Sequence, residues 1–220
     1  MDFYVRPMHS EDVPQVTQIE REAFATTWPP TAFRRELGNR MSRYLVVSVE
    51  ADGYKVGESG SVVQSLVPPA AWVQRMVEGV KNLFGVPPEI INLEQEFVAG
   101  YVGIWFIVDE AHITSIAVRE PLRRTGLGEL LVMASVELAM VRRAQRVTLE
   151  ARISNEPAHA LYEKYGFKKI NIRKRYYSDN GEDAYIMTVD SILSPSYQRK
   201  FEELVTLYNR RRGEAKRILA

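Results

Sequence analysis

Two glycines, Gly126 and Gly128, follow the arginine pair Arg123 and Arg124 and open a strongly helical run. The first N–H groups of a helix are unpaired, and its dipole is positive there. Glycine lets a bulky anion approach the backbone, and the two arginines add positive charge. The pattern indicates a phosphate or pyrophosphate site, with a tight turn carrying a solvated arginine pair as the alternative.

This loop differs from the two common phosphate-binding fingerprints. It is not a P-loop, because no Gly-Lys-Ser/Thr follows the glycines. It is not a complete dinucleotide-binding motif either, because Leu131 stands where that motif has its third glycine. The loop alone therefore leaves both interpretations open, and the surrounding elements have to be considered.

Hydrophobic periodicity and turn residues predict the elements around the loop. The order of strands and helices predicts a mixed α/β fold, with a central sheet of about seven strands and helices on both faces. Ser10 is expected to cap the first helix, Asp109-Glu110 to turn between two central strands, and Gly166 to end a helix. The expected strands cover residues 3–8, 43–51, 96–108, 111–118, 146–153, 167–177 and 183–190, and the expected helices 11–25, a short one after 31, 126–143, 156–166 and 194–217.

Two segments stand apart from this alternation. Residues 54–95 contain one amphipathic helix between two proline pairs, which we interpret as an insertion. It could be extra core, a homodimer contact or a lid. The tail, 191–220, is expected to form a basic amphipathic helix whose charge complements its dipole, with RNA contact as the alternative. The expected division is a main domain over 1–190, which carries the insertion, and this helical extension.

Composition excludes several classes of function. The 220 residues suffice for one full-sized core, and the net charge of +1 gives no reason to expect nucleic-acid binding. The absence of cysteine excludes disulfides, thiolate metal sites and a cysteine nucleophile. No apolar run reaches membrane-spanning length and no signal peptide is evident, so we expect a cytoplasmic protein without a membrane partner. Three scattered histidines lack metal-ligand spacing and are expected at surface or satisfied buried positions: His9, His112 and His159.

The arginine–glycine loop also carries a family resemblance. The run RRTGLG, residues 123–128, resembles the R/Q-x-x-G-x-G/A signature of the GNAT superfamily of N-acetyltransferases. Other segments resemble one branch, the protein N-terminal acetyltransferases, which includes the RimI-type bacterial enzyme for ribosomal protein S18 and its archaeal relatives. The resemblance covers about 3–50 and 96–189 but neither the insertion nor the tail. The segments that carry it are 112–118, 155–167, 175–187 and 23–37.

This resemblance implies acetyl-CoA as cosubstrate and no metal. The pantetheine arm would pair with the backbone of residues 116–118, and the pyrophosphate would lie on the N–H groups of residues 123–128. Asn155 and Tyr162 would reach the cofactor from the other side. The implied cofactor-binding residues are Ile116, Ala117, Val118, Arg123, Arg124, Thr125, Gly126, Leu127, Gly128, Asn155 and Tyr162.

Acetyl transfer from a thioester requires a neutral amine. A free α-amino group has a pKa of about 7.7–8.0, so roughly 10–20% is neutral near pH 7, against about one lysine amine in 2,500. The resemblance implies Glu150 as the base, directly or through a water, with an ion pair to Arg152 as the alternative. It implies that Tyr162 protonates or hydrogen-bonds the leaving sulfur, with core packing as the alternative. The N–H of Val118 is the candidate oxyanion donor.

The resemblance also implies an acceptor slot and a function. Tyr176 and Tyr177 would form one wall and Phe24 and Trp28 the other, with ordinary strand aromatics and core packing as alternatives. The predicted function is acetylation of a protein N-terminus, S18 if the source is bacterial and a broader range if it is archaeal. Alternatives are an acetyltransferase for lysine or for a small amine (polyamine, amino acid or aminoglycoside), and a non-catalytic acyl-CoA-binding or ribosome-docking module.

Overall fold

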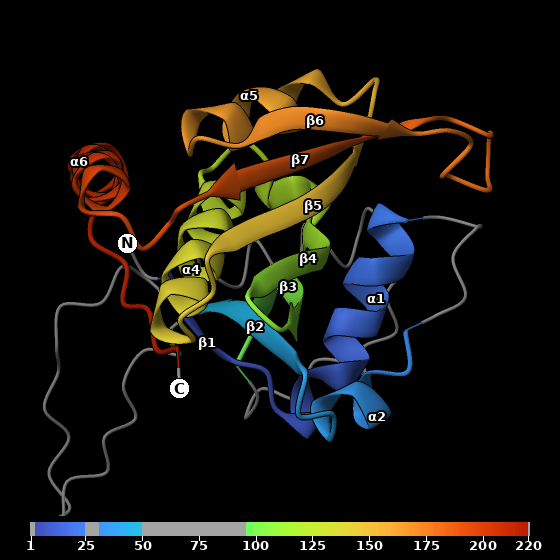
Figure 1. Ribbon diagram of the computed structural model, residues 1–220. Helices are drawn as coiled ribbons and strands as arrows, with labels where there is room; N and C mark the ends of the chain where they lie inside the picture. Colours follow the sequence, from blue (N-terminus) through green and yellow to red (C-terminus); the bar gives the residue numbers. More distant parts are fainter. Residues whose placement is uncertain (1–2, 25–30, 50–95, 220) are drawn as a thin grey trace, which may run out of the picture.

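The computed structural model describes residues 3–24, 31–49 and 96–219. Its sheet has seven strands in the order β1-β2-β3-β4-β5-β7-β6, and among these neighbours only β4 and β5 run parallel (Figure 1). The predicted mixed α/β fold and its order of elements are confirmed. The elements are β1 Phe3–Pro7, α1 Val13–Ala23, α2 Phe33–Leu37, β2 Ser42–Val49, β3 Val98–Ile107, β4 Glu110–Val118, α4 Leu127–Val141, β5 Arg146–Arg152, α5 Glu156–Lys164, β6 Lys168–Arg173, β7 Ala184–Asp190 and α6 Pro195–Arg212.

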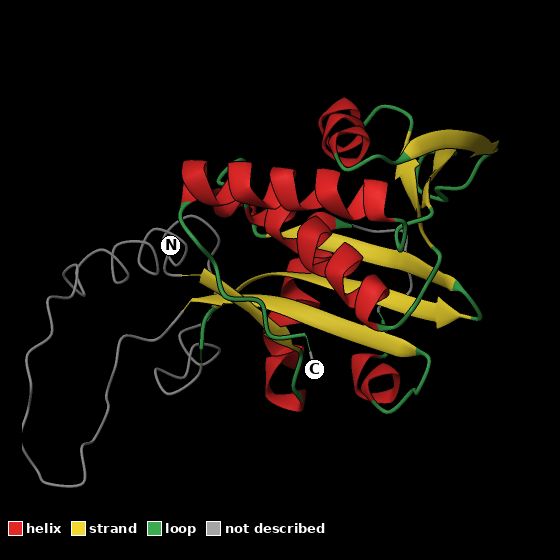
Figure 2. Ribbon diagram, turned by 60° about the vertical axis from the view of Figure 1, so that its left-hand side comes forward, coloured by secondary structure: helices red, strands yellow, loops and turns green. Residues whose placement is uncertain are grey.

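Helices cover both faces of the sheet, as Figure 2 shows. On one face α4, α5 and α6 share the larger apolar cluster, and on the other α1 and α2 share a smaller one. Ten of the fifteen residues of α4 are buried, because this helix lies between the sheet and two further helices. The central strand β3 contributes Val102 and Ile104 to the larger cluster and Val98 and Tyr101 to the smaller.

The sheet opens between β4 and β5. Their parallel pairing runs only from Glu110 opposite Arg146 to Ile113 opposite Leu149. Beyond this point β4 has an extra residue, Thr114, in its pairing with β3, while β5 continues against β7. A bulge of this kind bends the strand and increases its twist. We call the resulting opening, beyond Ile113 and Leu149, the splay.

Two predicted local features are wrong: the cap of α1 and the position of the turn between β3 and β4. Ser10 does not cap α1; it begins a 3-10 turn, and its hydroxyl donates to Glu11. Asp12 is the N-cap residue of α1 but makes no side-chain capping hydrogen bond there; its carboxylate accepts from the N–H of His9 and so caps the 3-10 turn. The turn between β3 and β4 lies one residue earlier than expected, at Val108–Asp109.

The C-terminal helix ends earlier than its periodicity predicts. It stops at Arg212, because Gly213 has a positive φ of 83° and turns the chain away. The chain then runs beside β1, where the N–H of Val5 donates to the carbonyl of Lys216 at 2.8 Å. Arg217 also forms an ion pair with Glu137 of α4, at 2.6 Å. The extension is therefore joined both to the sheet and to α4.

Two expectations fall outside the described residues: the insertion over 54–95, with its amphipathic helix, and Trp28. Within the described part of the chain, no helix is both long enough and apolar enough to cross a membrane. The same part holds no cluster of three or more residues that could ligate a metal ion.

Candidate active site

The arginine–glycine loop lies where β4 leads into α4. Gly126 is the N-cap of α4 and has a left-handed φ of 100°, which explains the glycine; Arg124 also has a positive φ, 67°. The first hydrogen bond of the helix joins the N–H of Leu130 to the carbonyl of Gly126 at 3.0 Å. None of the hydrogen bonds among described residues uses the N–H groups of residues 124–129. Six consecutive unpaired donors at a helix N-terminus form an anion-binding arrangement.

Gly128 supports this interpretation independently. A Cβ atom added there would meet nothing within 4 Å, so the packing of the described residues does not require a glycine. The missing side chain leaves room for a bound group to approach the helix. Glu129, an acidic residue in the same turn, accepts hydrogen bonds from Lys164, the last residue of α5, and from the hydroxyl of Tyr165, which follows it. These residues therefore fit the pyrophosphate of CoA.

The free edge of β4 continues this surface into the splay. The N–H of Arg119 donates to Ala99 of β3 at 2.9 Å, and antiparallel alternation turns the N–H groups of Ile116 and Val118 away from β3. β5 has already separated from β4 at this level, so these groups face the opening. The carbonyl of Val118 accepts from Arg123 Nε at 3.3 Å. The edge can thus pair with an amide-bearing arm, and the Val118 N–H can act as an oxyanion donor.

Glu150 lies on β5 just beyond the point of separation, with a side chain only 5% exposed. Its Oε2 is 2.7 Å from His112 Nε2 on β4, and its Oε1 is 3.1 Å from the Arg173 guanidinium on β6. The Arg173 contact is not aligned as a hydrogen bond, so the buried Oε1 has no hydrogen-bond donor among the described residues. The side chain therefore keeps one free acceptor.

The alternative prediction, an ion pair between Glu150 and Arg152, is wrong. Arg152 contacts Asp179 at 2.5 Å and Glu182 at 3.1 Å, both in the turn between β6 and β7. Sequence reasoning gave His112 no place in the site and did not consider Arg173. The signal that could have found His112 is its position on β4, the strand that pairs with the one carrying Glu150.

Tyr162 lies on α5 and is 6% exposed. Its ring packs 5.8 Å from that of Phe167, and its hydroxyl makes no hydrogen bond to another described residue. Burial, and then the neighbouring Tyr177, raises its pKa well above the usual value, so the hydroxyl stays protonated at working pH. The ring is part of the core, as the alternative expected, and the hydroxyl remains a neutral donor, which the catalytic role would require.

Asn155 is the N-cap of α5, where its side chain accepts from the N–H of Ala158 at 3.3 Å. The residue as a whole is exposed to solvent. Its position therefore has a structural cause, helix capping, that does not depend on a cofactor.

The two tyrosines of the loop between β6 and β7 lie edge to face, with ring centroids 5.2 Å apart. Burial is the main cause that raises the pKa of Tyr177, to about 12, and burial and Glu150 also raise that of Tyr176. Tyr177 is thus near enough to Glu150 and to Tyr162 to interact electrostatically with both. The structure brings these four side chains together.

Arg152 holds this loop against β5. Its guanidinium lies 3.8 Å from the ring centroid of Tyr177, besides contacting the two acidic residues. Hydrogen bonds from Ser154, and then from Arg152, lower the pKa of Glu182 to about 2.

Of the proposed second wall, Phe24 follows α1 and is 38% exposed. The remaining histidines lie outside this cluster: His9 is exposed, and His159 is buried, 2.9 Å from the carbonyl of Arg152.

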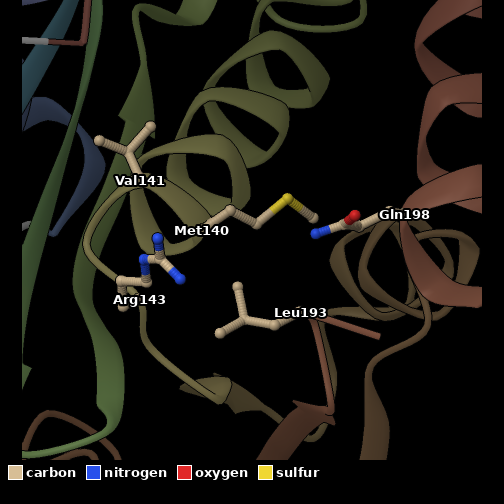
Figure 3. Close-up of a pocket in the computed structure, with 5 residues that line it drawn as sticks. All are labelled: Met140, Val141, Arg143, Leu193 and Gln198. Atoms are coloured by element: carbon tan, nitrogen blue, oxygen red, sulfur yellow. The ribbon is translucent and has the colours of Figure 1, made fainter. Parts of the chain in front are cut away.

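A separate cavity lies between the end of α4 and the start of α6 (Figure 3). It contains none of the expected site residues, and Arg143 is the only charged side chain among those that line it. The lining residues are Met140, Val141, Arg143, Leu193 and Gln198.

Comparisons with known proteins agree with this geometry. Residues 65–167 match the acetyltransferase (GNAT) family model, a range that includes part of the expected insertion. The chain is 36% identical over 186 residues to a candidate ribosomal protein bS18-alanine N-acetyltransferase of Bacillus subtilis, covering 84% of this chain and 93% of that one. It is 32% identical over 187 residues to an N-alpha-acetyltransferase of Sulfurisphaera tokodaii, covering 84% and 92%.

A solved structure shares the fold. The Escherichia coli ribosomal-protein-S18-alanine N-acetyltransferase superposes with a TM-score of 0.58 at 23% identity, covering 86% of this chain and 94% of that one. That structure supports the fold alone, whereas the family rests on the sequence relatives and the family model. The chain belongs to the GNAT family of acetyltransferases and is an acetyl-CoA-dependent N-acetyltransferase.

Proposed function

We propose that this enzyme acetylates the N-terminal α-amino group of a protein. The observation that carries the proposal is the buried Oε1 of Glu150, an acceptor without a donor beside the splay and the paired tyrosines. An incoming amine, or a water that it contacts, supplies the missing donor. The two sequence relatives named above, a bS18-alanine N-acetyltransferase and an N-alpha-acetyltransferase, support the same acceptor class.

In this mechanism Glu150 takes the proton of the attacking amine at Oε1, directly or through one water. His112 on β4 and Arg173 on β6 hold the carboxylate in position. The base need not be strong, because about 10–20% of α-amines are already neutral near pH 7. Acetyl-CoA supplies the thioester whose carbonyl carbon the amine attacks.

Two further groups complete the transfer. The N–H of Val118 donates to the carbonyl oxygen as negative charge develops on it. When the carbon–sulfur bond breaks, the hydroxyl of Tyr162 gives its proton to the departing thiolate, which is possible because burial keeps this hydroxyl neutral. The proton taken by Glu150 then leaves to solvent, and Tyr162 regains one.

The charges around the acceptor side favour an N-terminus over a polyamine. A small polycation needs free carboxylates in its pocket. The acidic residues described in the β6–β7 turn are already paired, Asp179 and Glu182 with Arg152, and Asp183 with Lys174. Lysine acetylation would need a base that shifts a far less favourable protonation equilibrium.

For the specific acceptor we propose the N-terminus of ribosomal protein S18 if the source is bacterial, and a broader range of N-termini if it is archaeal. The Bacillus protein named for bS18 supports the first option, and the Sulfurisphaera protein the second.

The test is release of CoA thiol from acetyl-CoA with a panel of amines. The panel contains short peptides beginning Ala-Arg, Ser and Met-Glu, the same peptides N-blocked with an internal lysine, and spermidine. We expect turnover only with free N-termini, rising with pH up to about 8 as the α-amine loses its proton. Turnover only with blocked peptides or spermidine would contradict the proposal, and acetyl-CoA binding without turnover would favour a non-catalytic module.

A further inference from the structure

The start of α6 lies beside the end of α4, and the end of α6 lies beside the start of α4. At one end Gln198 of α6 meets Met140 of α4 across the cavity in Figure 3. At the other end the Tyr208 hydroxyl donates to the carbonyl of Gly126 at 3.3 Å. The last turn of α6 therefore reaches the arginine–glycine loop, although more than eighty residues separate the two in sequence.

Arg212, the last residue of α6, passes directly over this loop. Its Nε lies 3.2 Å, and its Cγ and Cδ 3.4 Å, from the position that a Cβ atom would take at Gly126. The side chain is exposed, and it forms no ion pair with any carboxylate of the described residues. The acidic residue of that helix turn, Glu129, is instead bonded to Lys164. An unneutralised guanidinium thus lies beside the six unpaired N–H groups.

The position of Arg212 is fixed from both sides. On its N-terminal side α6 is anchored by Phe201 and Tyr208, which are buried in the larger core cluster. On its C-terminal side, the chain pairs with β1 and Arg217 bonds to Glu137 of α4. The backbone that carries the guanidinium is therefore held in place over the loop and does not depend on a ligand for its position.

We propose that Arg212 binds the phosphate groups of acetyl-CoA, so that the C-terminal extension supplies part of the cofactor site. The proposal rests on the function proposed above, because it assumes that the pyrophosphate lies on residues 123–128. A guanidinium suits this role, since it donates paired hydrogen bonds to phosphate oxygens and is always charged. Arg212 lies outside the stretch 65–167 that matches the family model.

The test is calorimetric measurement of affinity on the full-length protein for CoA, 3′-dephospho-CoA and pantetheine. We expect Arg212→Ala to weaken CoA binding by roughly tenfold or more, the range for a hydrogen bond to a charged group, and Arg212→Lys to weaken it less. Arg211→Ala is the matched control, because it removes one exposed charge from the same helix turn. It should stay within about twofold of wild type, since it lacks the contact with Gly126.

The three ligands identify the phosphate involved. A loss that persists with dephospho-CoA but vanishes with pantetheine assigns Arg212 to the pyrophosphate. A loss seen with CoA and absent with dephospho-CoA assigns it to the 3′-phosphate. An equal loss for pantetheine, or wild-type affinity of Arg212→Ala for CoA, would overturn the proposal.

Because these measurements need no acetyl acceptor, they separate this inference from the proposed function. A wild-type protein that acetylates N-termini, together with an Arg212→Ala variant of unchanged CoA affinity, would overturn the role of Arg212 alone. The converse pattern is a phosphate-dependent loss of CoA affinity in Arg212→Ala and no N-terminal acetylation by the wild type. It would overturn the proposed acceptor but not the role of Arg212. Thermal unfolding without ligand checks that all three variants fold as the wild type does.

Discussion

The two sides of the splay are built by different means. The cofactor side is one continuous stretch of backbone, the edge of β4 and the loop that starts α4, and its donors are peptide N–H groups. The acceptor side is assembled from side chains on β4, β5, β6 and the following loop, represented by His112, Glu150, Arg173 and Tyr176. A site made of backbone is recognisable from local sequence, whereas one made of side chains depends on how distant strands align.

The largest expected effect lies on the acceptor side. Glu150→Gln keeps the shape of the side chain but removes the proposed base, so kcat should fall by roughly 10²- to 10⁴-fold. The KM for acetyl-CoA should stay within about twofold, because the cofactor side does not involve this carboxylate. Steady-state kinetics with a free N-terminal peptide measure both. Glu163→Gln, at a carboxylate paired with Lys169 on the surface, serves as control. A Glu150→Gln variant with normal kcat but weakened acetyl-CoA binding would contradict the assignment of Glu150 to the acceptor side.

A pair of glycine variants sharpens the comparison on the cofactor side. Gly128→Ala should fold normally, because its methyl group enters open space, but it should raise the KM for acetyl-CoA by about 5- to 150-fold, equivalent to the 1–3 kcal/mol of overpacking. Gly126→Ala should also lower the unfolding temperature of the free protein, because φ is 100° there and the methyl group meets Arg212. Thermal unfolding and KM distinguish the two. Unchanged acetyl-CoA binding by Gly128→Ala would mean that no ligand approaches this turn.

A smaller effect is expected where Arg152 holds the β6–β7 loop. Arg152→Ala frees Asp179, Glu182 and Tyr177, so the KM for the peptide should rise about three- to tenfold with little change for acetyl-CoA. Lys174→Ala is the matched control, since its ion pair with Asp183 involves a lysine that is far more exposed. Equal changes in both KM values would show that the loop serves the cofactor as well as the acceptor.

The order of elements was predictable because each element carries its own periodicity, and the seven strands formed as expected. The arginine–glycine loop was predictable as the junction between a strand and a helix from its glycines, whereas the left-handed φ of Gly126 comes from the structure. The contact of Glu150 with His112 was not predictable, because it depends on a strand register that ends at Ile113. The arginine partners were not predictable either: Arg152 pairs with Asp179 in the turn between β6 and β7, and Arg173 pairs with Glu150.

The two wrong helix boundaries have causes that lie outside the helices themselves. Arg6 contacts the carboxylate of Asp12 at 2.6 Å and holds it where it caps the turn, so Ser10 is not needed as a cap. The end of α6 is set by Gly213, and the residues that follow find hydrogen-bond partners on β1 at the opposite end of the sequence. Neither contact can be recognised from the hydrophobic periodicity of the residues around it.

The pairing of β1 with the C-terminal residues has a consequence for synthesis. About 210 residues separate Val5 of β1 from Lys216, in the chain that covers its outer edge, so β1 leaves the ribosome long before its cover does. Until then the edge presents open N–H and C=O groups, which can pair with another chain. The edge is therefore covered only after residues 216–218 have been made, and removing these residues yields a protein with an open edge.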